Sequence, residues 1–249
     1  MPASPRFLPV VPAPGPDESV PREPPVFERI AILGIGLIGG SIALAARKAW
    51  PAALVIGVDR HEVLERAMVR HAVDVASTDP MIISAADLVV LATPVPEIVR
   101  LVAELPSQLA GEAVVTDVGS TKRQVVAAAA PLPAHLTFIG GHPLAGVPEA
   151  GFEHARADLF TGCPWLLTPP PAGGERSAQA LQKVSSFVAG LGALPVTVPS
   201  ADAHDDMVAA MERLIAELES LRPGLASAAT IERLFAAARE RRGHASPGA

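Results

Sequence analysis

Gly34-Ile35-Gly36-Leu37-Ile38-Gly39 is the stretch of sequence that decides the fold, and it directly follows the apolar run Ile30 to Leu33. That run predicts a buried strand, and the residues from Ile38 onward predict a helix. In this setting the first glycine permits a tight turn, the second allows a pyrophosphate to approach the backbone, and the third allows helix and strand to pack closely. Unpaired N–H groups at the helix start attract phosphate charge. The stretch therefore predicts a dinucleotide-binding βαβ unit.

A carboxylate, Asp59, follows the second predicted strand and lies twenty residues after Gly39. A carboxylate at this place accepts hydrogen bonds from the adenosine ribose hydroxyls of NAD and repels the 2′-phosphate of NADP. Arg60 acts in the opposite direction, because its guanidinium can bind that phosphate or stack on adenine; a solvated surface arginine is the alternative. We expect NAD as the cofactor, with NADP as the second choice.

Apolar runs alternate with helical patterns from Arg29 to about residue 200. The runs expected to form strands are Ile30 to Leu33, Leu54 to Val58, Leu88 to Leu91, Ala113 to Thr116, Leu136 to Ile139, Leu166 to Thr168 and Pro195 to Val198. The expected helices are Ile38 to Lys48, Glu62 to Arg70, Pro96 to Leu105 and Ser177 to Leu191. Strands that are apolar throughout are covered on both faces of a sheet. The chain is therefore predicted to be of the α/β class, with a Rossmann-type, doubly wound parallel sheet.

A helical segment without strands follows Ser200. Its first helix carries an apolar seam at spacings of four and three, made of Met207, Met211, Leu214, Leu218, Leu221 and Leu225. Pro223-Gly224 should end this helix near Arg222. A second helix with an apolar stripe follows, formed by Ile231, Leu234, Phe235 and Ala238. The seam must be covered, either by the sheet domain of its own chain or by a second copy. We expect a homodimer through these C-terminal helices.

Composition divides the chain into four parts. Residues 1–26 contain nine prolines, which remove backbone donors and disfavour helix, so we expect a disordered tail. Residues 27–200 are expected to form the dinucleotide-binding domain. Residues 201–242 form an abbreviated helical segment for dimerisation and substrate binding, and residues 243–249 a second tail.

Bulk properties narrow the range of partners. The formal net charge of −6 argues against nucleic acid as a partner, because nucleic-acid binders carry basic patches. No run approaches the roughly 18 uninterrupted apolar residues that a membrane span needs. The one cysteine, Cys163, cannot form an internal disulfide, which suits a reducing cytoplasm. We expect a soluble, cytoplasmic protein that acts on a small molecule and has no metal site.

Three segments after strand ends are candidates for the chemistry. Thr93-Pro94 makes a rigid turn near the expected nicotinamide position, or is a plain loop before a helix. Asp117 to Lys122 contains Ser120, whose hydroxyl either orients a base or a substrate alcohol, or caps a helix. Gly140 to Gly146 holds His142 between glycines and a proline. We expect this histidine on an exposed loop, either as a general base with a pKa near the working pH or as a hydrogen-bonded loop histidine.

The sequence resembles the prephenate/arogenate dehydrogenase family of tyrosine biosynthesis over about residues 28–200. The matching segments are Gly34 to Ser41, Asp117 to Lys122, Gly140 to Gly146, Ala155 to Phe160 and Pro164 to Pro169. The resemblance implies oxidative decarboxylation of prephenate or arogenate with hydride transfer to NAD, giving 4-hydroxyphenylpyruvate or tyrosine. It also implies that His142 takes the proton from the ring 4-hydroxyl and that Ser120 hydrogen-bonds this hydroxyl.

The helical segment is shorter than the helical domain of that family. Ala203-His204-Asp205 resembles the beginning of the domain, and Met211 to Leu218 and Leu234 to Arg239 resemble its end. The family's Ser-His-Leu-Pro-His and Phe-Arg-Asp segments have no counterpart here, and the arginine of the second is thought to bind a substrate carboxylate. Two alternative functions follow. One is a non-catalytic NAD-binding remnant of the family, and the other is a small-substrate NAD(P) reductase of another Rossmann family.

Overall fold

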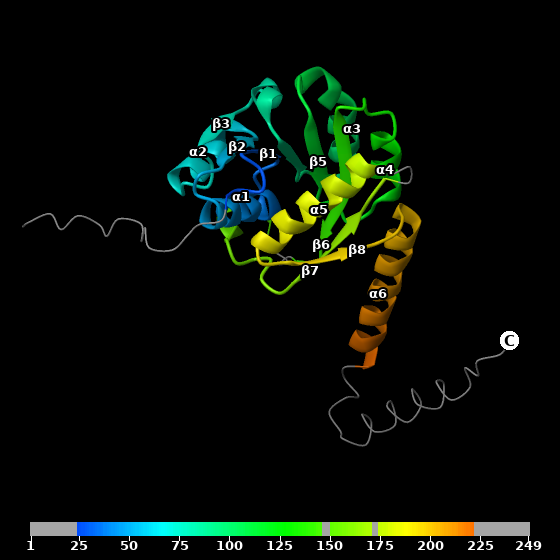
Figure 1. The fold of residues 1–249 in the computed structure, drawn as a ribbon. Coiled ribbons are helices and arrows are strands. Elements are labelled where there is room, and N and C mark those ends of the chain that lie inside the picture. Colours follow the sequence, from blue (N-terminus) through cyan, green and yellow to red (C-terminus); the bar gives the residue numbers. More distant parts are fainter. Residues whose placement is uncertain (1–23, 146–149, 171–173, 222–249) are drawn as a thin grey trace, which may run out of the picture.

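An eight-stranded sheet forms the centre of the computed structural model, which describes residues 24–145, 150–170 and 174–221 (Figure 1). The strands are β1 (Arg29–Leu33), β2 (Leu54–Val58), β3 (Val75–Ser77), β4 (Leu88–Leu91), β5 (Ala113–Asp117), β6 (Leu136–Pro143), β7 (Pro164–Thr168) and β8 (Leu194–Thr197). Their order in the sheet is β3-β2-β1-β4-β5-β6-β7-β8. The chain therefore builds outward from β1 to β3 and then returns to β4 on the other side of β1. This arrangement confirms the predicted doubly wound fold and places its switch point between β1 and β4.

Helices cover both faces of this sheet. The helical elements are α1 (Leu37–Ala49), α2 (His61–Val69), α3 (Val95–Gln108), α4 (Arg123–Ala129), α5 (Glu175–Gly190) and α6 (Ala201–Leu221), with the 3₁₀ turns η1 (Pro80–Ala85) and η2 (Phe152–His154). Alternate residues of β1 enter different cores. Ile30 and Ile32 pack with residues of α1, α2 and α5, whereas Ala31 and Leu33 pack with residues of α3 and α4. The expectation that the apolar strands are covered on both faces is confirmed.

The sheet differs from the sequence prediction at one strand pair. β7 runs antiparallel to β6, with His142 opposite Leu166, whereas every other pair is parallel within the described residues. Two strands that are consecutive in the chain can pair in parallel only if the connection between them returns to the end of the sheet where the first strand began. This connection is usually a helix. The described part of the β6–β7 connection contains only η2, so β7 starts where β6 ends and runs back beside it. The predicted doubly wound parallel sheet therefore contains one antiparallel pair, β6–β7, which the sequence did not indicate.

β3, α4 and the two 3₁₀ turns were missing from the sequence prediction. β3 has three half-buried residues, Val75–Ser77, and is too short to produce a recognisable periodicity. α4 lacks a side-chain cap from its own N-cap residue, Lys122, so no start signal of its own marks it in the sequence.

α6 is described as far as Leu221, and the break that we predicted near Arg222 lies outside the described residues. Three apolar side chains on it, Leu214, Ile215 and Leu218, are 54%, 55% and 50% exposed. Leu225 and the predicted second helix lie outside the described residues.

The glycine motif sets the distance between α1 and β1. Gly34 has φ +95°, and a Cβ atom there would lie 2.6 Å from the carbonyl oxygen of Ala92, which directly follows β4. A Cβ atom at Gly39 would overlap the carbonyl oxygen of Gly34. By contrast, a Cβ atom at Gly36 would meet no atom within 4 Å. Gly34 and Gly39 are therefore required by the fold, whereas Gly36 keeps space open in front of the helix.

Replacing Gly39 with alanine should destabilise the protein, because the backbone of β1 and α1 must separate to admit the new methyl group. We expect an overpacking cost of about 2 to 3 kcal/mol, which lowers the Tm of a domain of this size by about 5 to 10 °C. Gly36→Ala is the matched control and should cost at most about 1 kcal/mol, as a lost glycine N-cap. Thermal unfolding of both variants measures this, and equal stability of the two would contradict the packing role of Gly39.

Candidate active site

The glycine loop and Asp59 form one connected structure at the carboxyl ends of β1 and β2. The N–H of Gly34 donates to the carbonyl of Val58 at 2.9 Å, and the N–H of Ile35 donates to Asp59 Oδ2 at 2.6 Å. The other carboxylate oxygen of Asp59 accepts the N–H of Arg60 at 2.6 Å. The sequence prediction that Asp59 follows the strand beside the glycine loop is confirmed, and Arg60 is the N-cap of α2.

A cavity of about 570 Å³ opens beside this structure. Its lining includes Gly34, Asp59, Arg60 and Thr93, and it lies between the ends of β2 and β4. Thr93 Oγ1 is buried and has no hydrogen-bond partner among the described residues. The cavity therefore holds a buried hydroxyl that is ready to bond to a ligand.

The start of α1 is open to an anion. Gly36 is its N-cap and supplies no side-chain hydrogen bond, and no acidic residue lies in the first turn. Leu37 and Ile38 begin the helix and pack against the core, so their N–H groups are held in place. Such free N–H groups, with the helix dipole, bind phosphate. Pro94 is the N-cap of α3 at the same edge of the sheet.

A buried ion pair lies at the end of β5, between Asp117 and the N-cap residue of α4. Lys122 Nζ is 2.5 Å from Asp117 Oδ2, and neither side chain is exposed. Asp117 also accepts the N–H groups of Gly119 and Gly141 at 2.8 and 3.0 Å. Burial raises the pKa of the Asp117 carboxyl, and the Lys122 ammonium and these two N–H groups oppose that rise. By accepting the Gly141 N–H, Asp117 joins β5 to β6 immediately before His142.

His142 differs from its prediction in position and environment. It lies in β6 and not on a loop, because β6 continues through Pro143 to pair with β7. Its ring is half-buried, and its Nδ1 lies 3.1 Å from Nε2 of His204. Burial, followed by the nearby His204 and Lys122, lowers the pKa of His142 to about 4. The histidine is therefore an uncharged proton acceptor at neutral pH, and our expectation of an exposed group titrating near the working pH was wrong.

Ser120 lies in the turn between β5 and α4, at the same edge of the sheet. Its side chain is exposed and makes no hydrogen bond to any residue in the described ranges. The alternative that it caps α4 is wrong, because the carboxylate of Asp205 accepts the N–H groups of Lys122 and Arg123 at 2.7 and 3.2 Å. The Ser120 hydroxyl is thus available to a ligand.

The sequence prediction missed the contribution of the first turn of α6. Arg123 on α4 bonds Asp202 at 2.5 Å and Asp206 at 2.8 Å, and these contacts hold the turn against α4. His204 in this turn is completely buried. The only sequence signal was the resemblance of Ala203-His204-Asp205 to the start of the family's helical domain. This resemblance does not predict which residues these side chains contact.

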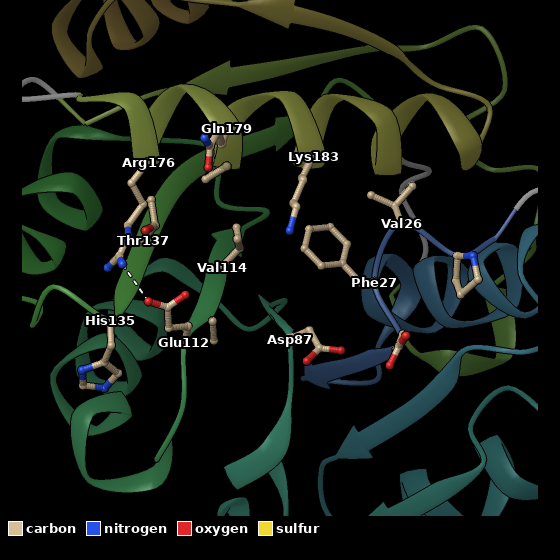
Figure 2. Close-up of a pocket in the computed structure, with 14 residues that line it drawn as sticks. Val26, Phe27, Asp87, Glu112, Val114, His135, Thr137, Arg176, Gln179 and Lys183 are labelled. Atoms are coloured by element: carbon tan, nitrogen blue, oxygen red, sulfur yellow. Dashed lines mark hydrogen bonds and ion pairs between the residues drawn. The ribbon is translucent and has the colours of Figure 1, made fainter.

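A second cavity, of about 520 Å³, lies at the opposite edge of the sheet beneath α5 (Figure 2). Glu112 and His135 line it just before β5 and β6 begin, and Arg176 of α5 pairs with Glu112 at 2.7 Å. Ligands of open α/β sheets bind at the carboxyl ends of strands. The edge that carries the glycine loop and His142 is therefore the candidate active site.

None of the helices in residues 24–145, 150–170 and 174–221 is long and apolar enough to cross a membrane.

Comparison with known proteins agrees with this geometry. Residues 42–197 match the family model described as prephenate dehydrogenase, nucleotide-binding domain. The chain is 36% identical over 182 residues to prephenate dehydrogenase of Bacillus subtilis, covering 72% of this chain and 48% of that protein. It is 32% identical to cyclohexadienyl dehydrogenase of Zymomonas mobilis, covering 76% of this chain and 64% of that protein.

Solved structures show the same relationship. The Synechocystis arogenate dehydrogenase structure superposes with a TM-score of 0.65 at 31% identity, covering 81% of this chain and 76% of that one. Prephenate dehydrogenase of Aquifex aeolicus in complex with hydroxyphenyl propionate and NAD⁺ gives a TM-score of 0.64 at 26% identity, covering 72% and 62%. The chain spans about half the length of several curated relatives that it matches. Through its nucleotide-binding domain, the chain belongs to the prephenate dehydrogenase family.

Proposed function

We propose that this protein catalyses the NAD-dependent oxidative decarboxylation of prephenate or arogenate, with His142 as the general base. The observation that carries the proposal is the half-buried His142, held by His204 at the same sheet edge as the cavity beside the glycine loop, in a chain of this family. The finding that the chain belongs to this family argues against a reductase of another Rossmann family. The non-catalytic remnant is the second candidate, and an activity measurement separates the two.

The residues present fit a dinucleotide. The open N–H groups of α1 and the free space in front of Gly36 suit a pyrophosphate. The carboxylate of Asp59 keeps a lone pair on each oxygen for the ribose hydroxyls, and the unpartnered hydroxyl of Thr93 lies in the same cavity. The NAD⁺ in the related Aquifex aeolicus structure supports NAD as the cofactor.

In this reaction the main task of the protein is to position the substrate hydroxyl and to accept its proton. NAD, when bound, accepts the hydride from the ring carbon that bears the hydroxyl. His142 takes the hydroxyl proton, and the exposed hydroxyl of Ser120 hydrogen-bonds the same oxygen and orients it. Loss of CO₂ then gives an aromatic ring, which makes the overall reaction favourable.

The proposal also includes a homodimeric assembly and a cytoplasmic location for this protein. The exposed apolar residues Leu214, Ile215 and Leu218 of α6 lie where two copies can pair through their helices, which supports a homodimer. The unpaired Cys163 and the biosynthetic relatives support a cytoplasmic location.

NAD should bind at least about tenfold more tightly than NADP, because the 2′-phosphate meets the Asp59 carboxylate. Calorimetric titration of each dinucleotide into the protein measures this difference. Gly36→Ala should weaken NAD binding by about tenfold or more while leaving the fold intact, since its methyl group occupies the pyrophosphate space. Equal or tighter binding of NADP would refute the preference and identify Arg60 as a phosphate ligand.

Replacing His142 with asparagine should lower turnover by about 10² to 10⁴-fold and leave the affinity for NAD nearly unchanged. NADH formation from prephenate, repeated with arogenate, gives the turnover, and calorimetry gives the affinity. Unchanged turnover would remove His142 from the mechanism. NAD binding by the unmodified protein without turnover of either substrate would identify the remnant.

A further inference from the structure

Three side chains form a continuous hydrogen-bonded chain that leads away from His142. His142 Nδ1 lies 3.1 Å from His204 Nε2, and His204 Nδ1 lies 2.8 Å from Asp205 Oδ1. His142 comes from β6, whereas the other two residues come from the first turn of α6. The side chain of His204 is completely buried and that of Asp205 is only 11% exposed. Water therefore does not replace these contacts easily, and each ring nitrogen in the chain needs a defined role.

Asp205, the last residue of this hydrogen-bonded series, is a fixed acceptor. Asp205 accepts the backbone N–H groups of Lys122 and Arg123 at the start of α4, in addition to the contact with His204. Burial acts to raise the pKa of the Asp205 carboxyl, but the hydrogen bonds from His204, Lys122 and Arg123 outweigh it, so this pKa lies below its ordinary value. An ionised carboxylate has lone pairs and no proton to donate. The nitrogen that faces it, Nδ1 of His204, must therefore carry the hydrogen.

The position of the hydrogen on His204 determines the position of the hydrogen on His142. Burial lowers the pKa of His204, so its ring is neutral and has one donor and one acceptor nitrogen. Because Nδ1 is the donor, Nε2 is the acceptor, and the Nδ1 of His142 that faces it must donate. In the opposite tautomer of His142, two lone pairs would face one another across 3.1 Å, and a buried hydrogen bond would be lost. Nε2 of His142 is then the nitrogen left without a proton.

We propose that His204 and Asp205 are positioning residues that hold His142 in the tautomer with its hydrogen on Nδ1, so that Nε2 is the atom that takes the proton from the substrate hydroxyl. As a catalytic role, this rests on the function proposed above. In the step itself the O–H bond of the substrate breaks and an N–H bond forms at Nε2. Nδ1–H of the resulting imidazolium continues to donate to His204. Within the described residues Nε2 of His142 has no hydrogen-bond partner, so it is free for this transfer.

The charges near His142, His204 and Asp205 are compatible with His142 as the proton acceptor. Asp205 supplies the negative charge that favours the imidazolium form of His142, and the Lys122 ammonium opposes it. Lys122 is itself paired with Asp117, and Arg123 lies 4.0 Å from Asp205 at the surface side. His142 is thus kept neutral before the reaction, and its cationic form retains a hydrogen-bond acceptor and a nearby carboxylate after it.

The tautomer is measurable without substrate, cofactor or activity. Nitrogen-15 NMR of the full chain, labelled at histidine, separates protonated from unprotonated ring nitrogens at neutral pH. A His142→Gln variant, which lacks the His142 signals, assigns them among the seven histidines of the chain. We expect hydrogen on Nδ1 and none on Nε2 for both His142 and His204. Hydrogen on Nε2 of His142, or a mixture of the two tautomers, would overturn the proposal.

Variants of His204 test the role in catalysis. His204→Leu removes the acceptor and should lower kcat by about 10- to 100-fold with KM little changed, because orientation of the base is lost while substrate contacts stay. In His204→Gln the amide can accept from His142 and donate to Asp205, so this variant should recover most of kcat and the Nδ1–H tautomer. His154→Leu, which changes an exposed histidine on η2, is the control and should leave both unchanged.

The outcomes separate this proposal from the proposed function. The predicted tautomer in a protein that turns over neither prephenate nor arogenate would leave the tautomer assignment standing and contradict the dehydrogenase function. An active protein in which His204→Leu keeps its kcat would contradict the positioning role. If His204→Leu unfolds, the tautomer of the unmodified protein and the kcat of His204→Gln still decide the question.

Discussion

The carboxylate of Asp205 joins two parts of the molecule that the sequence places far apart. It closes the open N–H groups of α4 and bonds the ring of His204, so the first turn of α6 lies against the end of the sheet. Unpaired N–H groups at a helix start attract a negative charge, and a buried imidazole needs a partner; one side chain satisfies both requirements. Arg123 also holds this turn through Asp202 and Asp206, but Asp205 is the residue that bonds His204 itself. The chemistry of β6 therefore depends on a residue of the helical segment.

The state of His142 follows from this packing. An exposed histidine has a pKa near 6.5 and is partly charged at neutral pH. Here α6 and the antiparallel strand β7 both pack beside the end of β6, and the Lys122–Asp117 pair beneath it holds two charges in a fixed place. The cost is a pKa of His142 near 4, which makes it a weaker base than an exposed imidazole. The gain is a base that is always uncharged when the substrate arrives and that presents a single nitrogen.

The sequence was a good guide to the sheet and to the cofactor half of the site, and a poor one to the base. Gly34, Gly36, Gly39 and Asp59 act within one βαβ unit, so their spacing along the chain predicts their geometry. The apolar strands β1, β2 and β4 were likewise placed correctly from local pattern alone. The environment of His142 depends on His204, which is 62 residues away, and on the pairing of β6 with β7. Neither contact leaves a periodic or motif signal, which is why a half-buried strand histidine was predicted as an exposed loop residue.

The central claim is that packing between the helical segment and the sheet keeps His142 half-buried, uncharged and held by His204. Following the carbon-bound ring protons of His142 by NMR while the pH is lowered tests this claim most directly, in the full chain and without ligands. The account predicts that His142 stays neutral well below pH 6 and titrates with an apparent pKa of about 4. Titration near the ordinary value of about 6.5 would show an exposed ring and contradict the account.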